Sequence, residues 1–262
     1  MTSAAPIREA TAFFTEDQLE SFHRDGFVIV RGLFAPEEAR LIAGWVDELA
    51  AFAEVPGESM FYYEASVLDA DERVLSRIEY FADFHERLGS MMRRPELLGR
   101  SAELFGADAN LFKEKVNFKL PGGQGFEPHQ DAQAGWRDYG DLHITIMITV
   151  DPAGEENGCL EIAAGHHRRG LIGELWKPMT ERQLYGIDFV KLPTEPGDAV
   201  FFDSFTPHRS APNRSDRRRR VLYITYAKAA DGDNRERYFA DKRRNYPPDI
   251  ERQPGKSYEY KV

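Results

Sequence analysis

A histidine and an aspartate separated by one residue form the chemical centre of this sequence. The run 122–131 reads GGQGFEPHQD, so a turn rich in glycine and proline leads directly to His129 and Asp131. On an extended segment, residues two apart project to the same side, and both side chains can therefore bind one ion. Two imidazoles and one carboxylate on one face of an octahedron leave three positions open, which suits iron(II) centres that activate dioxygen. This interpretation requires a second histidine from a later segment.

His208 is the natural candidate for the third ligand. It follows a Gly-Asp turn and an apolar run at 199–202, and it precedes Ser210 and a Pro-Asn pair. We therefore predict a metal site built from His129, Asp131 and His208. His166 and His167 are a weaker pair, because adjacent residues on a strand point in opposite directions.

Arg219 stands eleven residues after His208, where another apolar run begins. A guanidinium at that place can form a bidentate pair with a carboxylate. We expect the keto-acid end of 2-oxoglutarate to chelate the metal while Arg219 binds the distal carboxylate, with the Ser210 hydroxyl as a second donor. The neighbouring arginines are alternative anchors: Arg217, Arg218 and Arg220.

The first hundred residues are predicted to be mainly helical. Thr15 and Gln18 match a capping box that starts a helix ending near Asp25. Gly26 then leads into an apolar strand at Phe27–Val30, and Pro36 suits the first turn of a second helix. Four residues at helical spacing predict the buried face of that second helix: Leu41, Trp45, Leu49 and Phe52. Two further stretches are interpreted as helices: 72–93 and 95–105.

From residue 107 onward the pattern becomes strand-like, with turns containing glycine and proline between the runs, which predicts a sandwich or barrel. The predicted strands are 111–120, 142–150, 159–162, 189–192, 199–202 and 221–226. In the run 142–150, aliphatic residues alternate with His143, Thr145, Met147 and Thr149. Packing of the aliphatic face under a helical layer would direct the mixed face to a polar lumen, but a mixed face exposed to solvent fits this pattern equally well.

Several other residues are candidates for the lumen. Asn117 and Lys119 share a strand face with Lys115 and could enter it. His143 either lines the cavity or forms a cross-strand hydrogen bond. Thr145, on the same face as His143, is predicted together with Asn117 to contact the cosubstrate.

Composition limits the function classes. The formal net charge of −10 argues against a general nucleic-acid-binding protein, which usually carries a basic footprint. The single cysteine, Cys159, excludes an internal disulfide framework and fits a reducing compartment. No stretch approaches 18 apolar residues, and the N-terminus has no pattern typical of a secretory signal. We therefore expect a cytoplasmic protein with a small-molecule partner and no nucleic-acid or membrane partner; the oligomeric state stays open.

Taken together, these motifs resemble the phytanoyl-CoA dioxygenase family. The shared features are the His129-x-Asp131 pair, Asn157-Gly158-Cys159-Leu160, Gly197-Asp198, and His208-x-Ser210 followed by Pro212-Asn213 and Arg219. Their order and local spacing agree over roughly residues 20–228, and Asp25-Gly26-Phe27-Val28 is similar to the opening of that family.

The resemblance implies a mainly β protein whose double-stranded β-helix, or jelly-roll, core carries flanking helices. It also implies iron(II), 2-oxoglutarate and dioxygen as cofactor and cosubstrates. One oxygenase domain is expected over 1–262, with a mainly helical part at 1–106, the core at 107–228 and a C-terminal extension at 229–262. The presence of Asp131 favours hydroxylation, since related halogenating enzymes replace this carboxylate.

This chain departs from the family pattern at two positions. Some members have tryptophan where it has Met147, and the usual glycine after the distal histidine is Arg209. The run 238–250 looks similar to members that hydroxylate 2-aminoethylphosphonate, and the polar lumen residues favour a small charged substrate over a long acyl thioester. A zinc-type hydrolase and a non-catalytic jelly-roll binding module are the alternatives.

Overall fold

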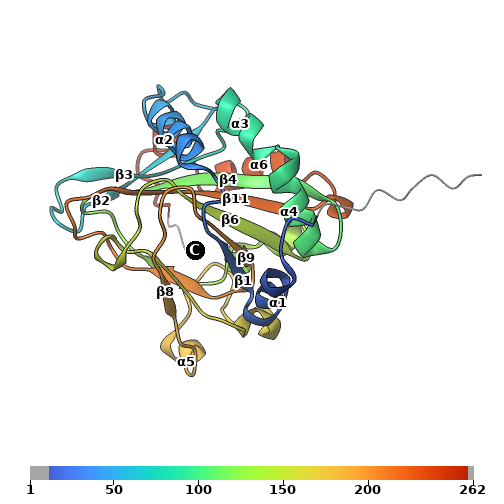
Figure 1. The fold of residues 1–262 in the computed structure, drawn as a ribbon. Coiled ribbons are helices and arrows are strands. Elements are labelled where there is room, and N and C mark those ends of the chain that lie inside the picture. Colours follow the sequence, from blue (N-terminus) through green and yellow to red (C-terminus); the bar gives the residue numbers. More distant parts are fainter. Residues whose placement is uncertain (1–11, 259–262) are drawn as a thin grey trace, which may run out of the picture.

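Two antiparallel β-sheets face each other at the centre of the protein (Figure 1). The computed structural model describes residues 12–258. The larger sheet has seven strands in the order β1-β9-β6-β11-β4-β3-β2, and the smaller has four in the order β5-β10-β7-β8. The strands are β1 Phe27–Val30, β2 Met60–Ala65, β3 Arg73–Glu79, β4 Ala109–Lys119, β5 Phe126–His129, β6 His143–Thr149, β7 Leu160–Ile162, β8 Val190–Leu192, β9 Ala199–Asp203, β10 His208–Ser210 and β11 Arg219–Lys228.

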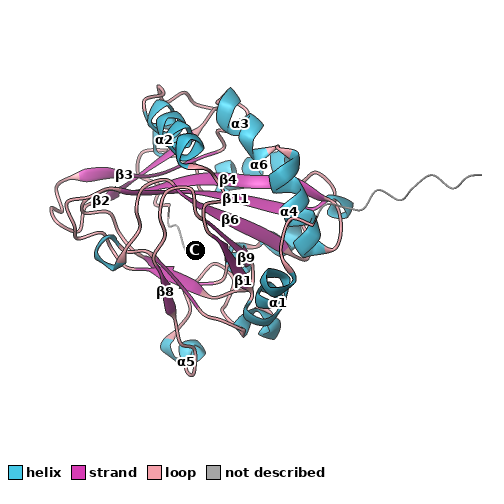
Figure 2. Cartoon of the chain, viewed as in Figure 1, coloured by secondary structure: helices cyan, strands magenta, loops and turns pink. Residues whose placement is uncertain are grey.

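Helices α2, α3 and α4 cover the outer face of the larger sheet, whereas α5 lies beside β8 of the smaller sheet (Figure 2). The helices are α1 Glu16–Asp25, α2 Pro36–Ala50, α3 Glu86–Met92, α4 Pro95–Phe105, the single turn α5 Glu181–Leu184, and α6 Arg235–Asn245. The main hydrophobic core lies between this helical layer and the sheet, where Ile42 and Leu97 from the helices meet Ile146 and Phe201 from the strands. None of the helices in residues 12–258 is long and apolar enough to cross a membrane.

Strand β6 shows how the sequence pattern divides the two faces of the sheet. Ile144, Ile146 and Ile148 belong to the core beneath the helices. His143, Thr145 and Thr149 point to the other face, and each is only 1% exposed. Of the two alternatives that the sequence left equally open, the structure shows the inward-facing one, because the smaller sheet covers that side.

The first helix and strand agree with the sequence prediction. Thr15 Oγ1 accepts from the Gln18 amide at 3.2 Å, and Gln18 Oε1 accepts from the Thr15 amide at 3.0 Å, which completes the capping box. Gly26 has φ 84°, and a Cβ there would lie 2.6 Å from Thr206 Oγ1. Only glycine therefore fits this tight passage from α1 into β1.

The buried face of α2 differs from the prediction. Leu41 is 57% exposed, and Phe52, which lies beyond the helix, is 38% exposed. The residues of α2 that are buried are Ala39, Ile42, Val46 and Leu49. The helix carries apolar residues on more than one face, and contact with the sheet selects the face that includes Ile42 and Val46.

The predicted helix at 72–93 is wrong. Its first part is strand β3, which pairs with β2 on one side and with β4 on the other, and α3 begins only at Glu86. Strand β2 was also missed, so the first hundred residues contain three strands and are not mainly helical. Ladder hydrogen bonds to β4, which is distant in the chain, decide this conformation, and local propensity does not reveal them.

The C-terminal extension expected at 229–262 contains helix α6, in which Tyr238 and Phe239 are buried. Residues 259–262 of this extension lie outside the described residues. The N-terminal segment 1–11, on which the expectation about a secretory signal rests, also lies outside them.

Candidate active site

Three predicted ligand residues meet between the two sheets. His129 ends β5 and His208 begins β10, and these two residues are directly paired in the antiparallel ladder. The potential ligand atoms of His129, Asp131 and His208 all lie within 4.8 Å of one another, and all three side chains are buried. Among the described residues they form the one group of three histidine, cysteine or acidic side chains that meets this criterion.

The backbone directs each ligand toward the centre of this group. Gln130 is extended, with φ −111° and ψ 136°, so that His129 and Asp131 project to the same side as predicted. The Nδ1 atoms of the two histidines lie 2.7 Å from the Glu127 carbonyl oxygen and 3.0 Å from that of Thr206. Because a carbonyl only accepts, these contacts place the hydrogen on Nδ1 and leave the Nε2 lone pair for a metal.

The electrostatic environment keeps these groups in their metal-binding forms. Burial, followed by the nearby His208, lowers the pKa of His129 to about 3. Burial also lowers the pKa of His208. Burial by itself would raise the pKa of Asp131, but His208 and Lys115 reverse this, so the pKa is lowered overall. Neutral imidazoles beside an ionised carboxylate are the protonation states that a divalent metal requires, and the donor set therefore fits such an ion.

The residue between the ligands supports them from behind, a role that the sequence analysis missed. Gln130 Nε2 donates to the carbonyls of Gly170 at 2.8 Å and Phe205 at 2.6 Å, and its Oε1 accepts from the Ile172 amide at 2.7 Å. The available signal was its position, because the residue inside a His-x-Asp pair must point away from the metal.

Thr145 lies behind the carboxylate ligand. Its hydroxyl donates to Asp131 Oδ2 at 3.1 Å and lies 3.0 Å from the hydroxyl of Thr225. Thr145 therefore contacts a predicted metal ligand directly. Such a contact fixes the orientation of the carboxylate.

Arg219 is the arginine of its run that faces inward. It is 1% exposed, and its Nη2 donates to the Gly158 carbonyl at 2.7 Å, while Nε and Nη1 have no hydrogen-bond partner. A buried guanidinium with two unmatched donor atoms is costly unless an acceptor arrives. This arrangement fits a carboxylate ligand.

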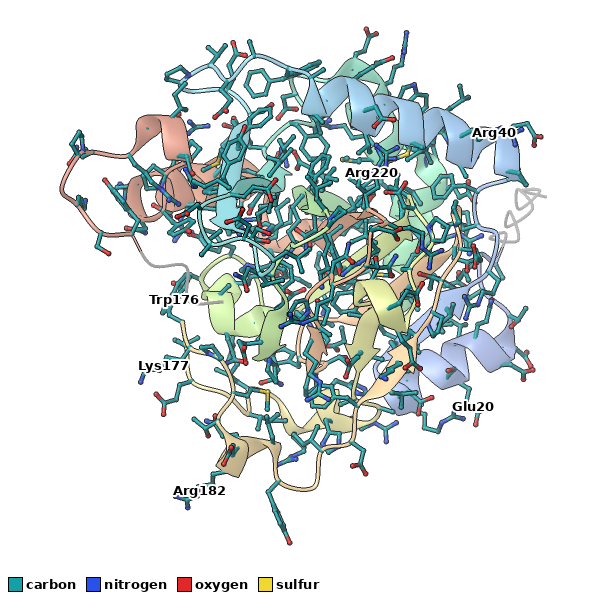
Figure 3. All side chains as sticks on the ribbon, turned by 90° about the vertical axis from the view of Figure 1, so that its left-hand side faces the viewer. Glu20, Arg40, Trp176, Lys177, Arg182 and Arg220 are labelled. Atoms are coloured by element: carbon teal, nitrogen blue, oxygen red, sulfur yellow. The ribbon has the colours of Figure 1, made fainter. Side chains whose placement is uncertain are left out.

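The other three arginines face away from the site. Arg217 pairs with Glu156 at 2.5 Å, and Arg218 pairs with Asp47 at 3.1 Å. Arg220 lies beneath α2, as Figure 3 shows, and pairs with Asp151 at 2.7 Å. Existing carboxylate partners therefore occupy the alternative anchors.

A small cavity of about 20 Å³ adjoins the three ligands. Its lining includes Asn117, Ser210, Arg209 and Tyr223. The Oδ1 atom of Asn117 has no hydrogen-bond partner. Arg209 instead donates to Glu161 at 2.8 Å. The structure thus brings Asn117 and Ser210 to one small space beside the ligands.

Lys119 enters this region as expected, since it is 3% exposed. Its Nζ donates to Ser210 Oγ at 2.7 Å and to the Ala211 carbonyl at 2.6 Å. Burial, followed by the charge of Arg219, lowers the pKa of Lys119 to about 6. Lys119 was predicted to share a strand face with Asn117 but was not among the predicted cosubstrate contacts.

The remaining histidines lie elsewhere. His143 packs against Phe112, with ring centroids 4.5 Å apart, and against Trp136 at 5.4 Å, and it is absent from the lining of the cavities described here. His166 and His167 lie in a short 3₁₀ helix, His166–Arg169, and do not join the ligand group.

A larger cavity of about 430 Å³ opens on the other side of His129 and Asp131. Its aromatic lining residues are Trp136, Tyr139, Trp176, Tyr238 and Tyr246. Its charged lining residues, apart from Asp131, are Lys113, Lys115, Lys242, Asp138 and Asp241. Helix α6 provides three of these side chains: Tyr238, Asp241 and Lys242. The C-terminal extension, whose role the sequence left open, therefore forms part of the cavity wall.

Comparisons with known proteins agree with this geometry. A family model described as phytanoyl-CoA dioxygenase matches residues 22–221. The chain is 41% identical over 253 residues to a 2-aminoethylphosphonate dioxygenase of Uncultured bacterium HF130_AEPn_1, covering 94% of each chain. It is 35% identical over 233 residues to a methylphosphonate hydroxylase of Gimesia maris, covering 88% of each.

Solved structures establish the fold. A crystal structure of EctD from S. alaskensis with 2-oxoglutarate and 5-hydroxyectoine superposes with a TM-score of 0.70 at 18% identity, covering 84% of this chain and 78% of that one. The crystal structure of the epimerase SnoN from nogalamycin biosynthesis superposes with a TM-score of 0.66 at 20% identity, covering 82% of this chain and 83% of that one. The predicted jelly-roll core with flanking helices is confirmed.

Proposed function

The chain belongs to the phytanoyl-CoA dioxygenase family, and from that premise we propose that it hydroxylates 2-aminoethylphosphonate. Membership makes it an iron(II)- and 2-oxoglutarate-dependent dioxygenase. The substrate proposal rests on a relative of that activity that matches 94% of the chain. One structural observation carries it further: the cavity beside His129 and Asp131 holds both cationic and acidic side chains.

We propose that His129, Asp131 and His208 hold the iron and that Thr145 orients the Asp131 carboxylate. When bound, iron supplies the activation of dioxygen that couples the oxidative decarboxylation of 2-oxoglutarate to hydroxylation of a C–H bond. The protein contributes ligand geometry and a cavity that limits access of water.

Arg219 is the proposed partner of the distal carboxylate of 2-oxoglutarate. Its two unmatched nitrogen atoms supply donors, while Ser210 and Asn117 lie beside the three ligands in the adjoining small cavity. Lys119 supports this arrangement by donating to Ser210 at 2.7 Å. These groups act by binding and orientation, because charge-assisted hydrogen bonds fix a planar carboxylate in one position.

The charges of the larger cavity favour a zwitterion. Lys113 and Lys242 can bind an anionic group, and the carboxylates of Asp138 and Asp241 with the surrounding aromatic rings can bind an ammonium group. An alkyl chain would leave these side chains desolvated without partners. A zinc hydrolase or a non-catalytic binding module would give Arg219 no ligand, and neither agrees with the family.

A panel of substrates tests this proposal. Succinate release and hydroxylated product should be measured for 2-aminoethylphosphonate, methylphosphonate, taurine and phytanoyl-CoA, with iron(II) and 2-oxoglutarate present. We expect the first compound to give the highest kcat/KM and coupled product. Efficient hydroxylation of phytanoyl-CoA with no response to the small phosphonates would contradict the proposal.

A further inference from the structure

We infer that helix α6 completes an anion-binding subsite in which Lys242 and Lys113 hold the phosphonate group of the substrate, and that Glu79 positions both lysines. This inference rests on the proposed function and assigns a role to a part of the chain that follows the family match, which ends at residue 221. Helix α6 begins only at Arg235.

The subsite is built around one buried carboxylate. Glu79 is 0% exposed and receives three cationic side chains. Lys242 Nζ lies 2.6 Å from its Oε2, Arg77 Nε lies 2.7 Å from its Oε1, and Lys113 Nζ lies 3.7 Å from its Oε2. Three basic side chains therefore converge on one buried carboxylate. Basic side chains held in fixed positions at a cavity wall can donate charge-assisted hydrogen bonds to an anion.

The two lysines of this cluster face the cavity. Lys113 and Lys242 both line the 430 Å³ cavity, whose wall also contains His129 and Asp131. Lys113 Nζ lies 5.2 Å from the ring centroid of Trp136 and 5.2 Å from that of Tyr238. These ring contacts hold the ammonium along the aromatic wall. An anion bound there therefore shares one cavity with the predicted metal ligands.

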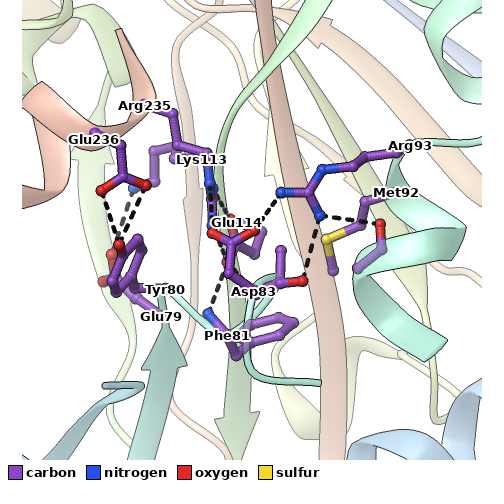
Figure 4. Close-up of polar contacts among 12 residues, drawn as sticks. Glu79, Tyr80, Phe81, Asp83, Met92, Arg93, Lys113, Glu114, Arg235 and Glu236 are labelled. Carbon is purple, nitrogen blue, oxygen red and sulfur yellow. Dashed lines mark hydrogen bonds and ion pairs between the residues drawn. The ribbon is translucent and has the colours of Figure 1, made fainter. Parts of the chain in front are cut away.

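Helix α6 is docked by a second buried ion cluster, which Figure 4 shows. Arg235 at its start donates to Glu114 at 2.9 Å and to Asp83 at 3.2 Å. Glu114 also accepts from the backbone amides of Phe81 and Ala82, each at 2.8 Å. The carboxylate thus ties the helix to β4 and to the segment after β3. Such buried, hydrogen-bonded pairs hold a helix in one orientation, which fixes the position of Lys242.

Helix α6 also contributes an acidic side chain, Asp241, to the wall of the same cavity. Asp241 accepts from the Tyr139 hydroxyl at 2.8 Å and lines the cavity together with Asp138. The helix therefore contributes one cation and one carboxylate from adjacent positions. A substrate that carries an anionic and an ammonium group matches this pair of charges better than a simple anion does.

Binding measurements on Lys242→Met and Lys113→Met test the inference. Isothermal titration under anaerobic conditions, with Mn²⁺ and 2-oxoglutarate bound, gives the Kd for 2-aminoethylphosphonate and, separately, for inorganic phosphate. Each substitution should raise the Kd for both anions by about tenfold or more, because a buried charge partner is lost. The Kd for 2-oxoglutarate should stay unchanged. Lys191→Met is the matched control, since the Lys191 side chain, on β8 of the smaller sheet, is 48% exposed, pairs with Glu155 and is absent from the cavity lining.

The possible outcomes separate the two proposals. Wild-type protein that neither binds nor hydroxylates any phosphonate would refute the proposed function itself. Wild-type protein that hydroxylates the phosphonate, with both lysine variants binding it as tightly as the control does, would overturn the subsite alone. Circular dichroism establishes that each variant is folded; if Lys242→Met is not, Lys113→Met on strand β4 decides the question, with phosphate affinity as the readout.

Discussion

Arg219 shows how a single buried charge indicates a ligand. The neighbouring arginines form ion pairs with surface or half-buried carboxylates. Arg219 is only 1% exposed, and two of its nitrogen atoms have no hydrogen-bond partner. Burying such a group without partners destabilises the folded protein. The cost is offset when a bound ligand accepts hydrogen bonds from the group. The anion that offsets it here is the proposed distal carboxylate of 2-oxoglutarate.

Arg219→Ala should raise the KM for 2-oxoglutarate by roughly 30-fold or more, because losing a charge-assisted carboxylate pair costs on the order of 2–5 kcal/mol. Iron stoichiometry should not change. Arg217→Ala is the control, since Arg217 is 62% exposed and pairs with Glu156. Initial rates against 2-oxoglutarate concentration measure the effect, and equal KM values for both variants would contradict the assignment.

Lys119 should make stability depend on pH. Its pKa of about 6 in the folded chain lies below the ordinary value of 10.5. Between these values the unfolded chain binds a proton that the folded chain lacks, so the contribution of Lys119 to stability rises with pH. The free energy of unfolding of wild type minus that of Lys119→Met should therefore increase from pH 6 to pH 10.

Urea unfolding of the metal-free protein at several pH values measures this difference. Lys177→Met is the matched control, because the Lys177 side chain is 65% exposed. A difference between wild type and Lys119→Met that stays flat, or falls with rising pH, would show that the Lys119 ammonium remains protonated in the folded protein.

At the scale of elements, the loop that carries Trp176 forms part of the wall of the 430 Å³ cavity. Trp176 lines that cavity although it is 51% exposed, and it has a positive φ of 63°. Its backbone amide donates to the Gln133 carbonyl at 2.8 Å, and the Gln133 side chain donates to the Glu174 carbonyl at 2.8 Å. A strained backbone persists where surrounding contacts impose it, and these contacts hold the Trp176 ring at the cavity wall.

Trp176→Ala should raise the KM for the substrate by roughly two- to tenfold, which corresponds to the 0.5–1.5 kcal/mol typical of one aromatic contact. The KM for 2-oxoglutarate should not change. Leu175→Ala is the control, because Leu175 is 48% exposed and is absent from the cavity lining. An equal effect on both KM values would indicate that the loop supports the whole site and does not act on the substrate alone.

Elements with strong local signals were predicted from the sequence, and elements decided by distant partners were not. The capping box of α1 and the alternation in β6 are local patterns, so both appear near their predicted bounds. Strand β3 depends on pairing with β4, and no local pattern in its sequence reveals that partner. The predicted buried face of α2 differs from the observed one for a related reason. The helix has several apolar stripes, and its contact with the sheet decides which of them is buried.

The same distinction applies to the site. His129 and Asp131 are two residues apart, so their shared direction follows from backbone geometry alone. His208 was inferred from the surrounding motif, and its ladder pairing with His129 places it as expected. Lys242 was not predicted as a site residue, because its proximity to Glu79 depends on how α6 packs against strands that are distant in the sequence.

At the scale of the whole molecule, metal binding should stabilise the fold. The three ligands connect the paired strands β5 and β10 with the segment that follows β5. A ligand at 100 times its Kd adds about 2.7 kcal/mol to the free energy of unfolding. For a chain of this size that corresponds to roughly 5–10 °C in Tm.

Thermal unfolding with Mn²⁺ and then with excess chelator measures this effect. We expect the increase in Tm in wild type and in the control His166→Ala. His129→Ala and His208→Ala should lose the increase and the iron-dependent turnover while keeping the metal-free Tm near that of wild type. A full Mn²⁺ shift in His208→Ala would remove this residue from the metal site.

The pairing of β1 with β9 has a consequence for how the chain reaches this structure. Phe27 lies opposite Phe202, so the first strand of the larger sheet finds its partner only after most of the chain has been synthesised. Until then its backbone groups and apolar side chains are available to other chains, and long-range pairing of this kind is slow. During production, β1 should therefore be a main site of misassembly, and lower temperature or slower expression should increase the soluble yield.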